Sequence, residues 1–253
     1  MAPAATPTFL PGLPGDLIEA MLRRSPGHEL VSGKFDSPES SSALTANGFG
    51  RFIVHPRDLP PLPGVPMGQA QSVTLEAEMR FPWEGGRHPW LDVAVETATT
   101  LVGVESKRYE PFRPAKANSF SGAFDARDWG VGMAHFTRLR QDLEAGKAGF
   151  QTLDAVQLVK QAYGLRTQAG KRAKGAVLVY LYAEPPRWAS GKPVDPARIA
   201  RHRVEVADFA HRVKGDDVVF AALRWSDLLT QWAGLAGLSR HAGAVMQRYG
   251  SLS

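Results

Sequence analysis

The 253-residue chain has no cysteine, which excludes disulfide bonds and thiolate metal sites. No apolar run approaches the ~18 residues that a membrane-spanning helix requires. The first residues include neither a basic segment nor an apolar one, so we expect no signal peptide and a cytoplasmic protein. The phosphate-binding loop, the dinucleotide-binding glycine motif, zinc-ligand spacing and the serine-hydrolase elbow are also missing. These absences exclude the enzyme classes that those motifs define.

Charge is distributed unevenly along the chain, whose net charge is +5. Residues 1–110 hold 9 Lys/Arg against 13 Asp/Glu, a net charge of −4, and residues 111–253 hold 21 against 12, a net charge of +9. An acidic part suits a divalent cation, and a basic part suits phosphate groups. Many arginine-rich proteins have no nucleic-acid partner, so the charge is also compatible with an ordinary solvated surface.

Periodicity predicts an α/β protein in which strands and helices alternate. The Pro-rich residues 1–14 are predicted to be disordered, and residues 15–253 are predicted to form a single domain. Residues 55–69 contain five prolines and are expected to be a loop. Strands are expected at 72–81, 176–183 and 218–223, a hairpin at 90–110, and helices from Asp16 and at 34–49, 135–146, 153–164, 195–213, 226–232 and 238–248.

The segment 90–109 carries most of the information in the chain. Two alternating runs flank a Thr-rich turn, and a four-residue loop would put Asp92 directly opposite Glu105, with Cβ atoms about 4.5–5.5 Å apart. Lys107 would share the face of Glu105. Gly103 would keep the surface beside the acidic pair open. In this register Val93 faces Val104, Ala94 faces Gly103, Val95 faces Val102 and Glu96 faces Leu101, while Leu91, Val93 and Val95 all point to the core.

Two carboxylates this close repel each other, so one would have a raised pKa unless a cation lies between them. Magnesium suits them, because it takes one or two protein carboxylates and keeps several waters. Manganese is the alternative ion. Lys107 could orient or deprotonate a water, or stabilise charge on a phosphorane-like transition state. An exposed strand edge with solvated charges would show the same residues.

Glu105-Ser106-Lys107, together with Asp92 upstream, resembles the motif of the PD-(D/E)XK nucleases, the restriction-endonuclease-like superfamily. The resemblance implies an α/β fold with a mixed central β-sheet flanked by helices. It also implies that Asp92, Glu105 and the backbone carbonyl of Ser106 bind the metal and that Lys107 serves the attacking water. The residue before Asp92 is Leu91, so the literal Pro-Asp dipeptide is absent.

Supporting residues are expected on two helices. Gln157 and Lys160 lie three apart on the helix after the hairpin, where related nucleases often carry a residue that reaches the site. Glu39 or Asn47 could approach the metal from the segment 34–49, although Ser-Pro-Glu is also an ordinary helix start. A solvated helix face explains Gln157 and Lys160 equally well.

The turn 170–175 contains Lys171, Arg172 and Lys174 and is the best candidate for contacts with phosphate, with a solvated loop as the alternative. The irregular segment 111–132 carries aromatic residues that could stack on bases or pack beneath a lid.

The expected function is magnesium-dependent hydrolysis of phosphodiester bonds in DNA, with RNA as a further possible substrate. An inactive nuclease fold that binds nucleic acid or serves in assembly is the alternative, followed by a structural protein with no nucleic-acid contact. No membrane partner is expected, and the sequence leaves the oligomeric state open.

Overall fold

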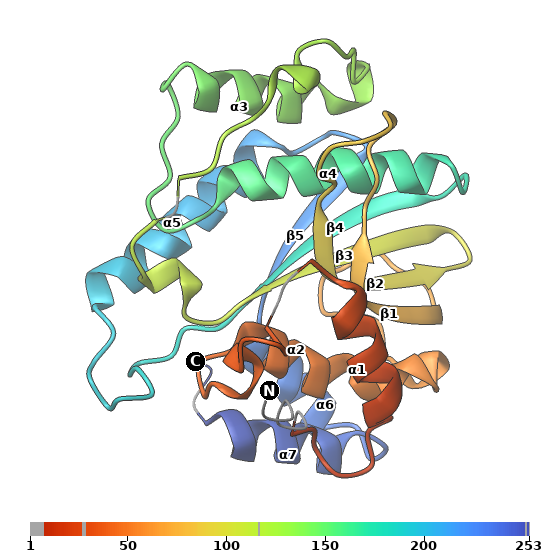
Figure 1. Ribbon diagram of the computed structural model, residues 1–253, viewed down its shortest axis with the longest axis vertical. Coiled ribbons are helices and arrows are strands. Elements are labelled where there is room, and N and C mark those ends of the chain that lie inside the picture. Colours follow the sequence, from red (N-terminus) through yellow and green to blue (C-terminus); the bar gives the residue numbers. More distant parts are fainter. Residues whose placement is uncertain (1–7, 27–28, 116, 251, 253) are drawn as a thin grey trace.

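The computed structural model describes residues 8–26, 29–115, 117–250 and 252. Its centre is a mixed five-stranded sheet with the strand order β1-β2-β3-β4-β5 (Figure 1). β1, β2 and β3 pair in antiparallel fashion, and β3, β4 and β5 are parallel. The strands are β1 (Ala70–Glu78), β2 (Trp90–Thr97), β3 (Thr100–Lys107), β4 (Gly175–Tyr182) and β5 (Val218–Arg224).

Helices cover both faces of the sheet (Figure 1). One layer consists of α1 (Gly15–Arg24), α2 (Ser41–Phe49), α6 (Trp225–Ala233) and α7 (Ser239–Tyr249), and the other of α3 (Ala134–Glu144), α4 (Ala155–Gly170) and α5 (Pro196–Arg212). α4 connects β3 to β4, and α5 connects β4 to β5, as parallel strands require. Within the described ranges, no helix has the length and apolarity needed to cross a membrane.

The core lies in two layers separated by the sheet. β4 is buried along almost its whole length because helices cover it on both sides, which explains its unbroken apolar run. Val177 and Val179 face α2 and α6, and Leu178 and Tyr180 face α4. The predicted strand 176–183 is therefore confirmed with a shift of one residue.

Helix starts agree with the predictions where a capping side chain is present. The Asp195 carboxylate accepts from the amide of Ala197 at 2.9 Å, and Pro196 begins α5 as predicted. α2 starts later than the predicted helix 34–49, because Ser40 caps it through the amide of Ala43. α6 begins directly after β5 at Trp225, so Ser226 and Asp227 lie inside the helix.

The N-terminal segment is more ordered than predicted. Phe9 packs edge-to-face against Phe35 with 5.5 Å between ring centroids, and the amide of Leu10 donates to Asn47 at 2.7 Å. These contacts fix residues 8–14 on the layer that contains α2. The remainder of the predicted disordered segment, residues 1–7, lies outside the described residues.

β1 and β2 change sides halfway along their length, which the alternating pattern did not predict. Leu75 packs in the same layer as Val93, whereas Met79 and Leu91 pack in the layer of α4. Glu76 lies at the change in β1 with a φ of +50°, a conformation that non-glycine residues rarely adopt. The expectation that residues 91, 93 and 95 share one face is therefore wrong.

Candidate active site

β3 brings two of the predicted catalytic residues to the end of the sheet near α4. Glu105 and Lys107 point toward this helix, as their shared face predicted. Ser106 points the other way, and its hydroxyl accepts from the indole of Trp225 at 3.1 Å. Glu105 is only 3% exposed, which is rare for a carboxylate that lacks partners. The hydrogen-bond donors around the carboxylate explain how Glu105 is kept in this buried position.

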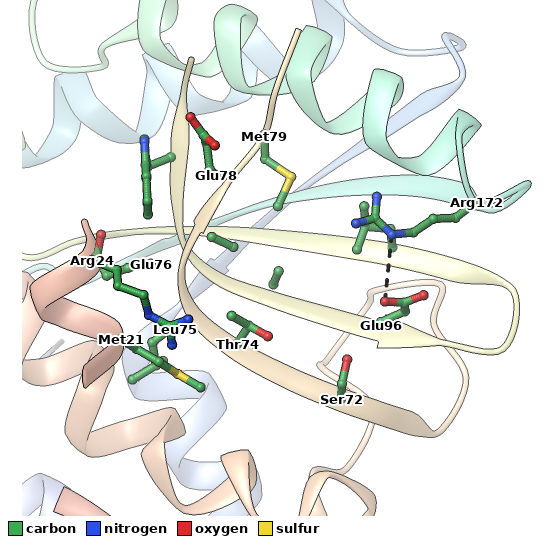
Figure 2. A pocket seen from close by; sticks show the side chains of 14 residues that line it. Met21, Arg24, Ser72, Thr74, Leu75, Glu76, Glu78, Met79, Glu96 and Arg172 are labelled. Atoms are coloured by element: carbon green, nitrogen blue, oxygen red, sulfur yellow. Dashed lines mark ion pairs between the residues drawn. The ribbon is translucent and has the colours of Figure 1, made fainter. Parts of the chain in front are cut away.

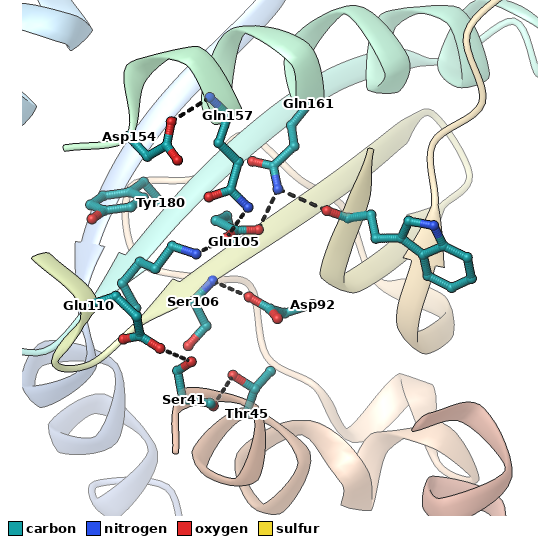
Figure 3. Close-up of polar contacts among 12 residues, drawn as sticks. Ser41, Thr45, Asp92, Glu105, Ser106, Glu110, Asp154, Gln157, Gln161 and Tyr180 are labelled. Atoms are coloured by element: carbon teal, nitrogen blue, oxygen red, sulfur yellow. Dashed lines mark hydrogen bonds and ion pairs between the residues drawn. The ribbon is translucent and has the colours of Figure 1, made fainter. Parts of the chain in front are cut away.

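Three donors bind the Glu105 carboxylate (Figure 3). The Gln157 amide donates to Oε1 at 2.9 Å, and the Lys107 ammonium contacts the same oxygen. The Gln161 amide donates to Oε2 and also to the backbone carbonyl of Trp90, the latter at 2.8 Å. Gln161 thus connects Glu105 to the strand that carries Asp92.

Asp92 lies beside β3, one residue away from its predicted partner. The register is confirmed for the four pairs from Val93–Val104 to Glu96–Leu101, and the pairing of β2 with β3 ends there, before Asp92 would face Glu105. The Asp92 carboxylate instead accepts from the backbone amide of Ser106 at 2.6 Å. Burial and the negative charge of Glu105 raise its pKa well above the usual range.

Lys107 is the cation of the site. Burial disfavours its charge, but the carboxylates of Glu105, Asp92 and Glu110 outweigh that effect and raise its pKa above the ordinary value. Lys107 is therefore a protonated donor in the metal-free protein. Of the three roles proposed for it from the sequence, orienting a water and stabilising charge on the transition state fit this protonated state, whereas deprotonating a water would require the neutral amine.

Glu76 is a further acidic residue at the site, and it was not predicted from the sequence. Leu75 pairs with Val93 and Ala77 with Leu91, so Glu76 lies level with Asp92. Burial, together with the charges of Glu105 and Glu29, raises its pKa to about 7. The position of Glu76 in β1 could have revealed its role, but only after β1 had been paired with the hairpin.

These groups line one cavity of about 340 Å³ between the sheet edge, α4 and the segment that leads into α2. Its acidic lining residues outnumber its basic ones by five to one. They are Glu29, Glu76, Asp92, Glu105 and Glu110, and Lys107 is the only base among the described lining residues. An excess of buried carboxylates favours a bound cation. Within the described ranges, no three acidic or histidine side chains converge into a ready-made metal cage.

Gly103 does not leave an open surface beside the site, contrary to the expectation. A Cβ at this position would come within 2.2 Å of Leu91 and 3.3 Å of Leu165. The glycine is needed because Leu91, having changed sides, packs directly over it. The openness of the site comes from the cavity at the end of β3.

The predicted supporting residues separate into two groups. Gln157 contacts Glu105, as described above, whereas the Lys160 ammonium donates to Asn118 at 2.8 Å and to the carbonyl of Ser119. The site residue missed on α4 is Gln161. The helical period alone could not distinguish position 160 from 161, because both are close to one turn from Gln157.

Neither candidate from the segment 34–49 lies in the acidic cavity. Glu39 pairs with Arg113 at 2.7 Å and accepts from the amide of Ala189 at 3.0 Å. Asn47 is fully buried and bonds the carbonyl of Ala43 and the hydroxyl of Tyr249, both at 2.8 Å. Both residues hold the fold together around the site.

The basic turn lies at the opposite end of the sheet from Lys107. Lys174 contacts Glu96 at 2.7 Å, and Arg172 lies 4.0 Å from the same carboxylate (Figure 2). Lys171 is exposed in the same turn. Glu96, which belongs to the same hairpin as Glu105, thus pairs with two of the three predicted phosphate-binding residues, and the turn keeps an excess of positive charge.

The aromatic residues of the segment 111–132 are mainly used in packing. Trp129 stacks on Tyr163 of α4 with 3.9 Å between ring centroids, and Phe124 is buried against Phe81. The two roles considered for these side chains were stacking on bases and packing, and Phe124 and Trp129 have the packing role.

A mixed five-stranded sheet with helices on both faces is the α/β fold expected of a restriction-endonuclease-like domain. The model of a protein family described as "Restriction Endonuclease associating with ARP" matches residues 13–250. The chain belongs to this family. No curated protein and no solved structure matches it. The predicted likeness to restriction-endonuclease-like nucleases is thus confirmed at the level of the family and the fold.

Proposed function

We propose that the protein is a magnesium-dependent nuclease that hydrolyses phosphodiester bonds of DNA with an activated water. The observation that carries the proposal is the meeting of Asp92, Glu105 and Lys107 in one acidic cavity at the end of β3. The family contributes the nuclease class, and the geometry of these side chains supports the chemistry.

The donor set fits a hard divalent cation. Asp92 and the buried Glu105 supply two carboxylates whose negative charges repel each other, and the backbone carbonyl of Ser106 would be the third protein ligand. Magnesium commonly takes so few protein ligands and completes its shell with water. When bound, it would lower the pKa of a coordinated water and neutralise charge on the phosphate.

The protein side chains would orient the reacting groups. Lys107, held protonated by its acidic neighbours, would donate to a phosphate oxygen or to the attacking water. Gln157 and Gln161 fix the Glu105 carboxylate from α4, so that it keeps its position as the substrate binds. Manganese would satisfy the same donors.

DNA as the substrate is supported by the net charge of +9 over residues 111–253. The family description names association with ARP, and we extend to this chain the proposal that it acts beside a partner protein. A cytoplasmic setting would suit the cysteine-free chain.

Cleavage of supercoiled plasmid with and without magnesium tests the proposal. Glu105→Gln should lower the rate by about 10³-fold, or about 4 kcal/mol of transition-state stabilisation, because a neutral amide is a poor ligand for a hard cation. Glu96→Gln is the matched control, since Glu96 is a glutamate of the same hairpin that pairs with Lys174 at the far end of the sheet. Its rate should stay within about twofold of the wild type, as expected for a surface charge.

Two results would contradict the proposal. Equal cleavage by Glu105→Gln and the wild type would exclude this site. Salt-dependent DNA binding without any metal-dependent cleavage would favour the alternative of an inactive nucleic-acid-binding module. Parallel reactions with single-stranded RNA would show whether the substrate class is broader than DNA.

A further inference from the structure

A second cavity, of about 520 Å³, lies directly beside the acidic one. Lys107, Glu110 and Gln157 line both cavities, so the two are neighbours that share a boundary at the catalytic lysine. Its volume is within the range of about 300–1,000 Å³ found for small-molecule sites. A group bound there would be adjacent to any phosphate held by Lys107.

The cavity walls are mainly apolar, and hydrogen bonds to α5 and between wall residues hold them in place. The carboxylate of Glu205 on α5 accepts from the amides of Gln151, Thr152 and Leu153 at 2.8–3.0 Å, which fixes the wall that precedes α4. On the opposite side, Asn118 donates to Asp154 at 3.2 Å. The apolar lining consists mainly of Pro111, Pro114, Leu143, Phe150, Leu153 and Val156.

Polar side chains, among them Glu110, Asp154 and Tyr180, complete the lining. Tyr180 is 2% exposed. Its hydroxyl is 2.9 Å from Nε2 of His202, whose Nδ1 is buried without a partner among the described residues. Burial lowers the pKa of His202 to about 4, so the imidazole is neutral and carries a single proton.

That proton can lie on either ring nitrogen. Either position leaves one donor without a partner among the described residues: Nδ1 if the proton lies there, or the Tyr180 hydroxyl if the proton lies on Nε2. Only Tyr180 lines the cavity, so a proton on Nε2, donated to the Tyr180 oxygen, leaves the unmet donor where a bound group can accept from it. A buried, unused donor beside an apolar cavity points to a ligand that offers a hydrogen-bond acceptor.

From this geometry we propose that the second cavity binds one unstacked nucleobase next to the phosphate at Lys107, with Tyr180 donating to an acceptor on the base edge. The inference rests on the proposed nuclease function, because that function places a phosphodiester at Lys107. A base within a duplex is stacked, so the substrate must be single-stranded there or must extrude a nucleotide.

Binding of mononucleotides to the full-length protein, measured by saturation-transfer NMR without magnesium, tests the pocket independently of cleavage. The probes are the four deoxynucleoside 5′-monophosphates, with deoxyribose 5-phosphate as the control that lacks a base. At least one nucleotide should bind about tenfold or more tightly than the control, because only the base reaches the apolar walls.

Three variants locate the contact. Val156→Trp should fill the cavity and weaken nucleotide binding about tenfold or more. Tyr180→Phe should weaken it about fivefold through the lost hydrogen bond. Tyr182→Phe is the matched control, because this tyrosine stacks on Tyr180 from the same strand but does not line the cavity, and its binding should be unchanged.

The pocket is disproved if deoxyribose 5-phosphate binds as tightly as every nucleotide, or if folded Val156→Trp binds nucleotides like the wild type. If Val156→Trp does not fold, equal binding by Tyr180→Phe and Tyr182→Phe disproves the donor role of Tyr180 and with it the proposal. The two proposals fail separately: nucleotide binding without plasmid cleavage rejects the nuclease, and cleavage without base-dependent binding rejects the pocket.

Discussion

The two ends of the parallel strands β3 and β4 carry opposite charge arrangements. At the first end, Glu96 is shared by Lys174 and Arg172, at 2.7 Å and 4.0 Å. At the other end, where β3 finishes at Lys107, the cavity has five carboxylates and a single ammonium. We call the first end balanced because its carboxylate is fully paired with cations, and the second end unbalanced because its carboxylates outnumber its described cationic side chain.

The unbalanced end is the one that points to function. Buried carboxylates without matching cations destabilise a fold, so a sequence retains them where they have a use. The balanced end has no carboxylate that needs a further cation, because Glu96 already pairs with Lys174 and Arg172. In the basic turn, which the sequence singled out for contacts with phosphate, Lys174 and Arg172 pair with Glu96 of the hairpin, and the phosphate contact stays a prediction.

Exchanging one lysine at each end should separate these roles most clearly. Lys107→Met should reduce plasmid cleavage by about 10²–10³-fold, because the ammonium is aimed at developing charge in the proposed reaction. Lys174→Met, which removes the same group from the balanced end, should change the rate by less than about twofold. Initial rates of nicking at saturating magnesium measure both, and a comparable loss in the two variants would contradict the distinction.

Low pH should stabilise the metal-free protein by protonating carboxylates at the unbalanced end. The pKa of Glu76 is raised from 4.5 to about 7, so the folded state holds a proton that the unfolded state releases in this range. Stability contributed by the protonated group is complete below the unfolded pKa and is lost as pH rises through the folded pKa. The loss should be about 2 kcal/mol, after allowance for the partial exposure of Glu76.

Urea unfolding in EDTA at about pH 4.5 and about pH 7.5 measures this difference. Glu76→Gln should flatten the pH dependence, and Asp92 should cause the slope that remains, because its pKa is also raised. Glu96→Gln is the control and should keep the wild-type slope. A wild-type protein that is more stable at the higher pH would contradict the carboxylate excess.

The sequence was sufficient to predict the hairpin because two independent patterns required the same register. Only one pairing puts the valines of both runs on one side, and the Thr-rich turn permits it. The capped start of α5 was predictable for a similar reason, since Asp195 and Pro196 act through local backbone geometry. These features depend on neighbours in sequence.

Features that depend on how elements pack were not predictable. Nothing local indicates that Glu76 adopts a positive φ, or that Leu91, on the neighbouring strand, packs over Gly103. The choice of Gln161 over Lys160 depends on how α4 is rotated on the sheet, which a helical period alone does not determine. The proposed base pocket could not be predicted from the sequence either, because segments around residues 110 and 150 form it together.

Magnesium should remove part of the difference between the two ends. A ligand that binds only the folded state at ten times its Kd stabilises it by about 1.4 kcal/mol, and here it would also relieve the carboxylate excess. Thermal unfolding at pH 7.5 with and without magnesium should therefore show a rise in Tm for the wild type and for Glu96→Gln. Asp92→Asn should lose most of the rise, because one ligand of the cation is gone. An equal rise in Asp92→Asn would place the ion elsewhere, and the acidic cavity would then need another explanation for its five carboxylates.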